Sequence, residues 1–352
     1  MIVVNARFLT QHITGVQRFA IEISLRLKDL LKDEVVFIAP KDILLEDYAK
    51  LLNVQRIGKL HGHLWEQIEL PLYLKRHGSP LLVCLCNTAP LYYRNKVVTL
   101  HDVAFYVFPK MFSKSFLTVY RFMIPRILKS ARHVITVSEF SKQEIIKFCV
   151  TDANKISVVY NAVSGDFRYI KDDELAKHKY FLAVSSLNYR KNFPAVLDSF
   201  KKFEEHNDDG LLYIIGDMSN SSFAALDIDK YKSDPRIKFL GRVSDKDLVR
   251  YYSNAVAFIY PSLYEGFGIP PLEAQQCNCP VISSNATSLP EVLSDSALFN
   301  SPNDIDGFTS SMRRIFNEEN LREQLIQKGL ENIKRFSWDK STRELINIIK
   351  SL

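Results

Sequence analysis

Short apolar segments rich in β-branched residues recur along the chain and alternate with segments of helical periodicity. Over residues 16–30 apolar side chains return to one helical face, and the same holds around residues 195–200. Strands that alternate with helices predict parallel sheets covered by helices on both faces. The segments expected to be strands read MIVVNARFL, EVVFIA, PLLVCL, KVVTL, HVITVS and KISVVY in the first half, and YFLAVSS, LLYIIG, IKFLG, AVAFIY and CPVISS in the second.

The alternation occurs twice, once on each side of a polar break near residues 164–179. A chain of 352 residues also suits two domains, on the usual expectation of ~150 residues for each. We therefore expect an α/β protein in which two doubly wound domains face each other across a cleft. In such folds ligands bind at the carboxyl ends of the strands, so residues that directly follow the apolar segments are the candidates for a site.

Composition places the chain among ordinary globular proteins, with 47% hydrophobic and 24% charged residues. Its apolar segments are shorter than the ~18 residues that a membrane-spanning helix needs, and the first ten residues do not resemble a signal peptide. The five cysteines lack further ligands at zinc-binding spacings. We therefore expect a cytoplasmic protein with reduced, structural thiols.

Positive charge is concentrated in the first half of the chain. Residues 1–165 hold 22 Lys and Arg against 13 Asp and Glu, whereas the whole chain carries a net charge of only +6. A basic half is compatible with a nucleic acid, an anionic membrane surface or an acidic substrate as partner. Lysines that are merely solvated are the simpler alternative.

Residues 114–133 interleave basic with aromatic and aliphatic side chains. This composition is typical of an amphipathic helix that lies on an anionic membrane surface. The alternative is a helix packed inward with solvated lysines, and Pro125 should kink the helix in either case. The basic members are Lys114, Arg121, Arg126, Lys129 and Arg132, and the apolar members are Phe116, Leu117, Tyr120, Phe122, Ile124 and Leu128.

Two carboxylates flank the glycines and prolines of the segment YPSLYEGFGIPPLEAQQ. Glu265 follows the expected strand AVAFIY, whereas Glu273 should lie in the first turn of a helix that begins at Pro270. The glycines let the backbone approach a ligand, and a helix start offers N–H groups to an anion. Two acids beside a phosphate would repel it unless they hold hydroxyl groups, which points to a nucleotide sugar. The alternative for Glu273 is a helix-dipole carboxylate worth ~0.3–1 kcal/mol.

Two cations follow another expected strand in the segment FLAVSSLNYRKNFPAVLDSF. Arg190 and Lys191 precede a helix that Asn192 can cap. Cations at a helix N-terminus oppose the helix dipole, and a bound diphosphate would resolve that conflict.

Three more residues follow expected strands. Gly15 lies between the first strand and a helix, where the absence of a side chain permits close approach. His101 and Asp102 directly follow KVVTL, at the edge where ligands bind. The alternatives are an ordinary turn glycine and a structural His-Asp pair.

Several other motifs are absent or unsuitable. The chain contains no P-loop, no G-x-G-x-x-G dinucleotide fingerprint and no G-x-S-x-G elbow. The triplet DID occurs at 227–229 and at 304–306, but neither copy clearly follows a strand into a site. We therefore expect no metal site.

Taken together, these motifs resemble those of the retaining glycosyltransferases of family four. The E-x7-E spacing of YEGFGIPPLEA is preceded, in order, by LHDV, VVYNAV, RKN and FLGRVSDKDL. The segments NARFLTQHITGVQRFAIEI and HDVAFYVFP are most similar to the branch that contains bacterial O-antigen mannosyltransferases. The resemblance spans the chain and implies a GT-B fold with an acceptor-binding Rossmann-like domain over residues 1–165 and a donor-binding one over 166–335. A C-terminal helix over residues 336–352 would cross back to the first domain.

The resemblance also implies roles for individual residues. Glu265 would hold a donor-sugar hydroxyl and Glu273 the ribose, while His101 would contact the sugar next to the reacting carbon. The diphosphate would bind Arg190 and Lys191, with Gly15 close to it from the other domain. The base would meet Arg242 and Val243, the pocket would be lined by Gly266, Phe267, Gly268 and Ile269, and catalysis would involve His101, Lys191 and Glu265. One departure is that Ser185 and Ser186 occupy positions where many members have a Gly-Arg pair, which makes Arg190 the replacement cation.

The implied reaction is metal-independent hexosyl transfer with retention, by front-face attack in which the leaving phosphate receives the acceptor's proton. No cofactor is expected beyond the donor, for which GDP-mannose is the first expectation and a UDP- or dTDP-sugar, as in a rhamnosyltransferase, the alternative. The acceptor would be a lipid-diphosphate-linked sugar or an oligosaccharide in O-antigen or capsule synthesis, with peripheral contact to the inner face of the cell membrane and no nucleic-acid partner. Rival interpretations are a GT-B epimerase, a phosphorylase or a non-catalytic sugar-nucleotide-binding scaffold.

Overall fold

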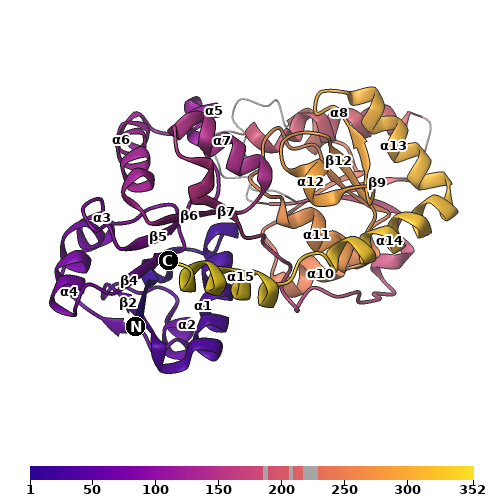
Figure 1. Ribbon diagram of the computed structural model, residues 1–352. Helices are drawn as coiled ribbons and strands as arrows, with labels where there is room; N and C mark the ends of the chain where they lie inside the picture. The colour runs from indigo at the N-terminus through magenta and orange to yellow at the C-terminus, as the bar shows by residue number, and fades with distance from the viewer. Residues whose placement is uncertain (185–188, 206–208, 217–228) are drawn as a thin grey trace. The chain divides into compact units, whose positions relative to one another are not determined.

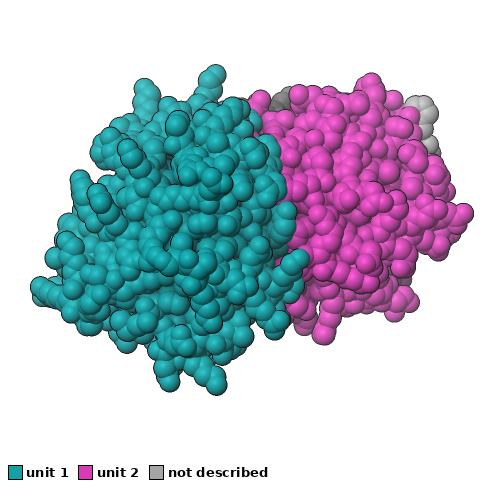
Figure 2. All heavy atoms as spheres, viewed as in Figure 1, with its two compact units in different colours: residues 1–161, 337–352 teal, residues 162–336 magenta. Residues whose placement is uncertain are grey.

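The computed structural model describes residues 1–184, 189–205, 209–216 and 229–352 (Figure 1). The chain forms two compact units, which Figure 2 distinguishes by colour. Unit 1 consists of Met1–Asn161 and Ser337–Leu352, and unit 2 consists of Ala162–Phe336. Each unit contains its own parallel sheet and its own hydrophobic core.

Unit 1 is built on a seven-stranded parallel sheet with the order β3-β2-β1-β4-β5-β6-β7. The chain winds outward from β1 to β3 and then returns to place β4 on the other side of β1, so the direction of winding reverses between β1 and β4. In open α/β sheets this reversal is where ligands bind. The strands are β1 (Ile2–Asn5), β2 (Val35–Ala39), β3 (Gln55–Arg56), β4 (Leu81–Cys84), β5 (Lys96–Thr99), β6 (His133–Thr136) and β7 (Ile156–Val158).

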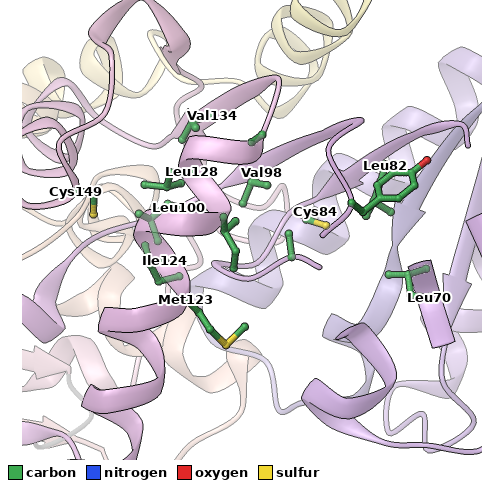
Figure 3. Packing of buried hydrophobic residues seen from close by; sticks show 14 of the residues in the cluster. Leu70, Leu82, Cys84, Val98, Leu100, Met123, Ile124, Leu128, Val134 and Cys149 are labelled. Carbon is green, nitrogen blue, oxygen red and sulfur yellow. The ribbon is translucent and has the colours of Figure 1, made fainter. Parts of the chain in front are cut away.

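Helices flank this sheet (Figure 1). Buried side chains of α6 pack on strand residues, as Figure 3 shows for Ile124 and Leu128 beside Val98 and Val134. The helices of unit 1 are α1 (Gly15–Leu31), α2 (Glu46–Leu51), α3 (Gly62–Leu64), α4 (Leu70–Arg76), α5 (Ala104–Val107), α6 (Lys114–Ser130), α7 (Glu139–Cys149) and α15 (Trp338–Lys350). A 3-10 turn, η1 (Ala6–Thr10), follows β1, and a π-helical turn, η3 (Trp65–Glu69), joins α3 to α4.

The C-terminal helix α15 belongs to unit 1, although the rest of the chain's second half forms unit 2. Asp339 accepts a hydrogen bond from Arg26 of α1 at 2.6 Å, and the Trp338 ring meets Phe19 edge-on at 5.9 Å. The expected return of a C-terminal helix to the first domain is therefore confirmed.

Unit 2 has a six-stranded parallel sheet with the order β10-β9-β8-β11-β12-β13. The winding reverses here between β8 and β11, in the same manner as between β1 and β4. The strands are β8 (Tyr180–Val184), β9 (Leu211–Ile215), β10 (Ile237–Gly241), β11 (Ala257–Tyr260), β12 (Val281–Ser284) and β13 (Leu298–Asn300). The helices are α8 (Phe193–Glu204), α9 (Asp229–Lys232), α10 (Asp245–Asn254), α11 (Ile269–Gln276), α12 (Leu289–Leu293), α13 (Ile305–Asn317) and α14 (Glu319–Ile333).

Every segment expected to be a strand contains one, whereas the short edge strands β3 and β13 were not expected. The helix expected over residues 114–133 ends at Ser130, because Ala131 adopts an extended conformation and His133 begins β6. Among the helices of the described ranges, none has the length and apolarity needed to cross a bilayer.

Candidate active site

The reversal point of unit 2 brings together two segments that are far apart in the sequence. Strands β8 and β11 are neighbours, and the chain beyond their carboxyl ends carries Lys191 and Glu265, respectively. Parallel strands end at the same edge of the sheet, so the two side chains meet where doubly wound folds bind ligands.

Lys191 and Glu265 form a buried ion pair. The Lys191 Nζ lies 2.6 Å from Glu265 Oε1, and the side chains are only 14% and 11% exposed. Lys191 also donates to the Tyr260 hydroxyl at 2.7 Å, and that hydroxyl donates to Glu265 Oε1 at 2.8 Å. The Ser262 hydroxyl donates to the same oxygen at 2.5 Å. Oε1 therefore accepts from three donors, while no group within the described residues hydrogen-bonds Oε2.

The electrostatics of this cluster keep the carboxylate charged. Burial opposes ionisation of Glu265, but the positive charges of Lys191 and Arg190 outweigh it, so the Glu265 pKa lies below its usual 4.5. Burial and the nearby Glu265 charge raise the Tyr260 pKa well above 10. At neutral pH the tyrosine therefore remains a donor and Glu265 Oε2 remains a hydrogen-bond acceptor.

The backbone around Glu265 is fixed by residues that follow β12. The Thr287 hydroxyl accepts from the Glu265 N–H at 3.0 Å. The Ser288 hydroxyl lies 3.0 Å from the Glu265 carbonyl oxygen and 2.9 Å from that of Phe267, and its hydrogen can serve either. Sequence reasoning missed these supports, together with Tyr260 and Ser262. The available signal was that Thr287 and Ser288 also follow an apolar strand segment.

Gly268 is the N-cap of α11 and has a φ of 95°, in the left-handed region that favours glycine. A Cβ atom at this position would lie 2.7 Å from Leu289 Cδ2. The missing side chain of Gly268 thus leaves room for Leu289 of α12, and the expected approach of the GFG segment to a ligand stays a prediction. Whether Gly266, Phe267 and Ile269 line a donor pocket stays a prediction.

Helix α11 begins at Ile269, and this start corrects the expected position of Glu273. No acidic residue lies in the first turn, because Glu273 is the fifth residue of the helix. The helix-dipole alternative for Glu273 is thereby weakened, since the dipole effect acts within the first turn. Pro270 and Pro271 also lack N–H groups, so of the first three helical positions only Ile269 has one.

Arg190 and Lys191 lie in a 3-10 turn beyond β8. The Arg190 carbonyl accepts from the Leu263 N–H at 2.7 Å, which ties this turn to the Glu265 segment. Asn192 occupies the N-cap of α8, but its side chain donates to the Pro302 carbonyl at 2.6 Å and makes no capping hydrogen bond. The expected side-chain cap is therefore wrong, because that contact takes the side chain to Pro302.

Arg242 and Val243 are the predicted contacts of the base. Arg242 and Val243 follow β10 at the same carboxyl edge, with β9 between β10 and β8. Ser185 and Ser186 lie outside the described residues, as does most of the first DID triplet, and the second is a helix cap in which Asp304 accepts from the Gly307 N–H at 2.9 Å.

His101 lies in unit 1, beyond β5, and is 6% exposed. Its Nε2 is 3.0 Å from the Leu85 carbonyl oxygen, and because a carbonyl only accepts, Nε2 carries the proton. Burial lowers the His101 pKa, so the ring is neutral at neutral pH. Asp102 accepts from the Ala104 N–H at 2.9 Å, so the described hydrogen bonds join it to the backbone rather than to His101.

Gly15, also in unit 1, is the first residue of α1 and is exposed. Thr14 and Gln17 close a capping box around this helix start. Across the described ranges, no group of three or more His, Cys, Asp and Glu residues is arranged to hold a metal ion.

Two family models together match most of the chain. The model described as "Glycosyltransferase Family 4" matches residues 13–167, and the one described as "Glycosyl transferases group 1" matches residues 167–332. Among curated proteins, O-antigen chain mannosyltransferase B of Escherichia coli is 32% identical over 73% of this chain and 70% of its own. O-antigen chain mannosyltransferase RfbU of Salmonella typhimurium is 34% identical over 75% of this chain and 73% of its own.

Solved structures share the fold over almost the whole chain. A glycosyltransferase from Rickettsia africae is 19% identical with a TM-score of 0.77, and the match covers 99% of this chain and 97% of that one. Anabaena Alr3699/HepE, solved in complex with UDP-glucose, is 16% identical with a TM-score of 0.78, covering 100% and 99%. WaaG, a glycosyltransferase involved in lipopolysaccharide biosynthesis, is 15% identical with a TM-score of 0.75, covering 99% of both chains. These matches confirm the GT-B fold.

Proposed function

We propose that this chain transfers mannose from GDP-mannose. It belongs to glycosyltransferase family 4 and is therefore a retaining hexosyltransferase that uses a nucleotide-sugar donor. The acceptor would be a lipid-diphosphate-linked sugar or an oligosaccharide in O-antigen or capsule synthesis. The observation that carries the proposal is the Lys191–Glu265 pair at the reversal point of unit 2, with one carboxylate oxygen left open. Mannose is favoured because the O-antigen mannosyltransferases named above are over 30% identical to this chain.

The pair suits cleavage of a sugar–diphosphate bond. As the bond breaks, negative charge grows on the leaving phosphate, and a preorganised cation such as Lys191 stabilises that charge by an amount on the order of 3–4 kcal/mol. Glu265 Oε2 would hold a sugar hydroxyl, so that the anomeric carbon faces the acceptor as it becomes oxocarbenium-like. The neutral His101 ring donates a hydrogen bond through Nε2 to the Leu85 carbonyl, so its Nδ1 would accept a hydrogen bond from a hydroxyl group of the sugar.

We propose further that α6 contacts an anionic membrane. Its inner face is buried through residues such as Ile124 and Leu128, as the alternative interpretation expected. Its outer face nevertheless exposes Phe122 to 51%, and the Arg126 guanidinium lies 3.7 Å from the centroid of that ring. Tyr92, which is 89% exposed, lines the same surface hollow as Phe122 and Arg126. Aromatic and basic groups side by side are the chemistry of a membrane interface.

The membrane contact is tested with vesicles that contain anionic lipid. Reversing the charges at Arg121, Arg126 and Lys129 should abolish salt-sensitive binding. Reversal at three exposed lysines elsewhere in unit 1, Lys32, Lys41 and Lys50, serves as the matched control, with the same net change and no expected loss. Equal binding by both variants would refute the α6 surface.

The donor is tested by screening sugar nucleotides for calorimetric binding and slow hydrolysis. GDP-mannose should bind most tightly, and Lys191→Ala should lower turnover far more than it weakens acceptor binding. Preference for a UDP- or dTDP-sugar would refute the mannose assignment and leave family membership unaffected. Tight binding without turnover on any acceptor would favour the non-catalytic scaffold.

A further inference from the structure

A second buried polar cluster lies at the reversal point of unit 1. Arg7 follows β1 and Thr88 follows β4, and these strands are neighbours. Glu66, from the π-helical turn η3, enters between them. π-helical turns are rare and occur frequently at functional sites. No role was assigned to any of these residues from the sequence.

Glu66 is the centre of this cluster and is 1% exposed. Its Oε1 accepts from Asn5 Nδ2 at 2.8 Å and from Arg7 Nε at 3.2 Å. Arg7 Nη2 in turn donates to the Thr88 hydroxyl at 2.8 Å. Burial opposes ionisation of Glu66, but the charge of Arg7 and the contact with His63 outweigh it, so the Glu66 pKa lies below its usual range.

The second carboxylate oxygen of Glu66 faces His63. Oε2 lies 3.4 Å from His63 Nδ1, and among the described residues neither atom has a hydrogen-bond partner that meets normal geometry, although both are buried. The imidazole itself is 41% exposed. A carboxylate beside Nδ1 favours the proton on that nitrogen, which leaves Nε2 as a hydrogen-bond acceptor directed away from Glu66.

Tyr120 of α6 completes the surroundings of the imidazole. Its ring meets His63 edge-on at 6.0 Å and stacks on Phe116 at 3.8 Å. Burial raises the Tyr120 pKa, so its hydroxyl stays protonated at neutral pH. Within the described residues, neither this hydroxyl nor Arg7 Nη1 has a hydrogen-bond partner.

A purely structural cluster would satisfy its own polar atoms. Buried polar groups in folded proteins are hydrogen-bonded in the large majority of cases, yet within the described residues Arg7, which is only 8% exposed, keeps Nη1 without a partner. The same cluster carries an acceptor nitrogen on His63, a donor nitrogen on Arg7 and a hydroxyl group on Tyr120 that can both donate and accept. Because Glu66 offsets the charge of Arg7, the cluster offers little attraction to an anion and suits a neutral polyhydroxylated ligand.

We propose that His63, Arg7 and Tyr120 form a subsite for the hydroxyl groups of a neutral pyranose, the acceptor sugar, with Glu66 as the positioning residue. This inference rests on the proposed function and specifies where its acceptor binds. The loop after β4 supports the assignment. Thr88 contacts Arg7, while Asn87 of the same loop accepts from the His101 N–H at 2.9 Å. The subsite is thereby joined to the histidine expected beside the reacting carbon.

The decisive experiment compares His63→Ala with His63→Gln, using GDP-mannose, or the sugar nucleotide that proves to be the donor, and methyl α-mannoside as the acceptor probe. Losing one hydrogen bond of ~1.4 kcal/mol should raise the acceptor KM about tenfold in His63→Ala. Calorimetric donor binding and donor hydrolysis by water should stay unchanged. His63→Gln places an amide oxygen, also a hydrogen-bond acceptor, near the position of Nε2, so its acceptor KM should lie between those of wild type and His63→Ala.

Two further variants sharpen the result. His61→Ala removes a neighbouring imidazole that is 65% exposed and pairs with Asp42, so it should behave as wild type. Glu66→Gln should raise the acceptor KM more than it lowers kcat, because the imidazole loses its orientation. An unchanged acceptor KM in His63→Ala, or an equal loss of donor hydrolysis, would overturn the subsite.

Failure of the proposed function is separable from failure of the subsite. If wild-type protein neither binds nor hydrolyses any sugar nucleotide, the donor proposal fails. Binding of methyl α-mannoside can then be followed directly by saturation-transfer NMR. A signal from wild type that His63→Ala abolishes would support the subsite, and a signal that persists in His63→Ala, or no signal from wild type, would refute it.

Discussion

Replacing Lys191 by methionine tests the electrostatic centre of unit 2. Methionine keeps the length of the side chain and removes its charge, so Glu265 remains as an uncompensated carboxylate that is 11% exposed. Removing one partner of a buried ion pair costs about 3–5 kcal/mol of the free energy of unfolding. Because Tyr260 and Ser262 still donate to Glu265 Oε1, we expect a loss near the lower end, about 3 kcal/mol.

The dependence of this loss on pH follows from the Glu265 pKa. In wild type this pKa is depressed below 4.5, so the carboxylate contributes stability above that pH and loses it as the pH falls through the folded-state pKa. In Lys191→Met the main charge that lowers the pKa is gone and burial raises it. The variant should therefore be most destabilised near neutral pH, and the difference from wild type should shrink as acid protonates Glu265.

Urea unfolding monitored by far-UV circular dichroism measures the effect. Trp65 and Trp338 both lie in unit 1, so tryptophan fluorescence reports that unit separately. In unit 2, Lys177→Met breaks a solvent-exposed pair with Glu174 and should change stability by less than about 0.5 kcal/mol. Adding Glu265→Gln to Lys191→Met should recover roughly 1–3 kcal/mol. A Lys191→Met loss no larger than that of Lys177→Met, or one independent of pH, would refute the reasoning.

Three further predictions concern the donor site. Glu273→Ala should weaken calorimetric binding of the bare nucleoside diphosphate, whereas Glu265→Ala should leave that binding intact and lower turnover; the opposite pattern would exchange the two carboxylates. Turnover should persist in EDTA because Lys191 meets the leaving-group charge, and an absolute need for added magnesium or manganese would contradict this account. Gly268→Ala should lower the free energy of unfolding in urea by about 1–3 kcal/mol, because its φ is 95° and the new Cβ would lie 2.7 Å from a leucine methyl group. Gly165→Ala is the control and should lose less, because nothing lies within 4 Å of its Cβ.

Much of the fold follows from local sequence chemistry. Apolar β-branched segments identify the buried parallel strands, since a parallel sheet covered on both faces excludes polar side chains from its strands. The edge strands β3 and β13 escaped this reasoning because they are short and their residues are half-buried or exposed. Family membership could also be predicted from the sequence, because the E-x7-E spacing and the motifs before it each lie within a continuous stretch of residues.

The pairings within the sites were decided by tertiary structure alone. Lys191 and Glu265 are 74 residues apart, and only the reversal of winding between β8 and β11 makes them neighbours. The cluster around Glu66 could not be predicted from the sequence, for a further reason. Glu66 lies within a helical segment rather than after a strand, and its partner Arg7 is 59 residues away. Sequence patterns reveal which residues can be buried or charged, but which charges face each other is set by the order in which the strands assemble.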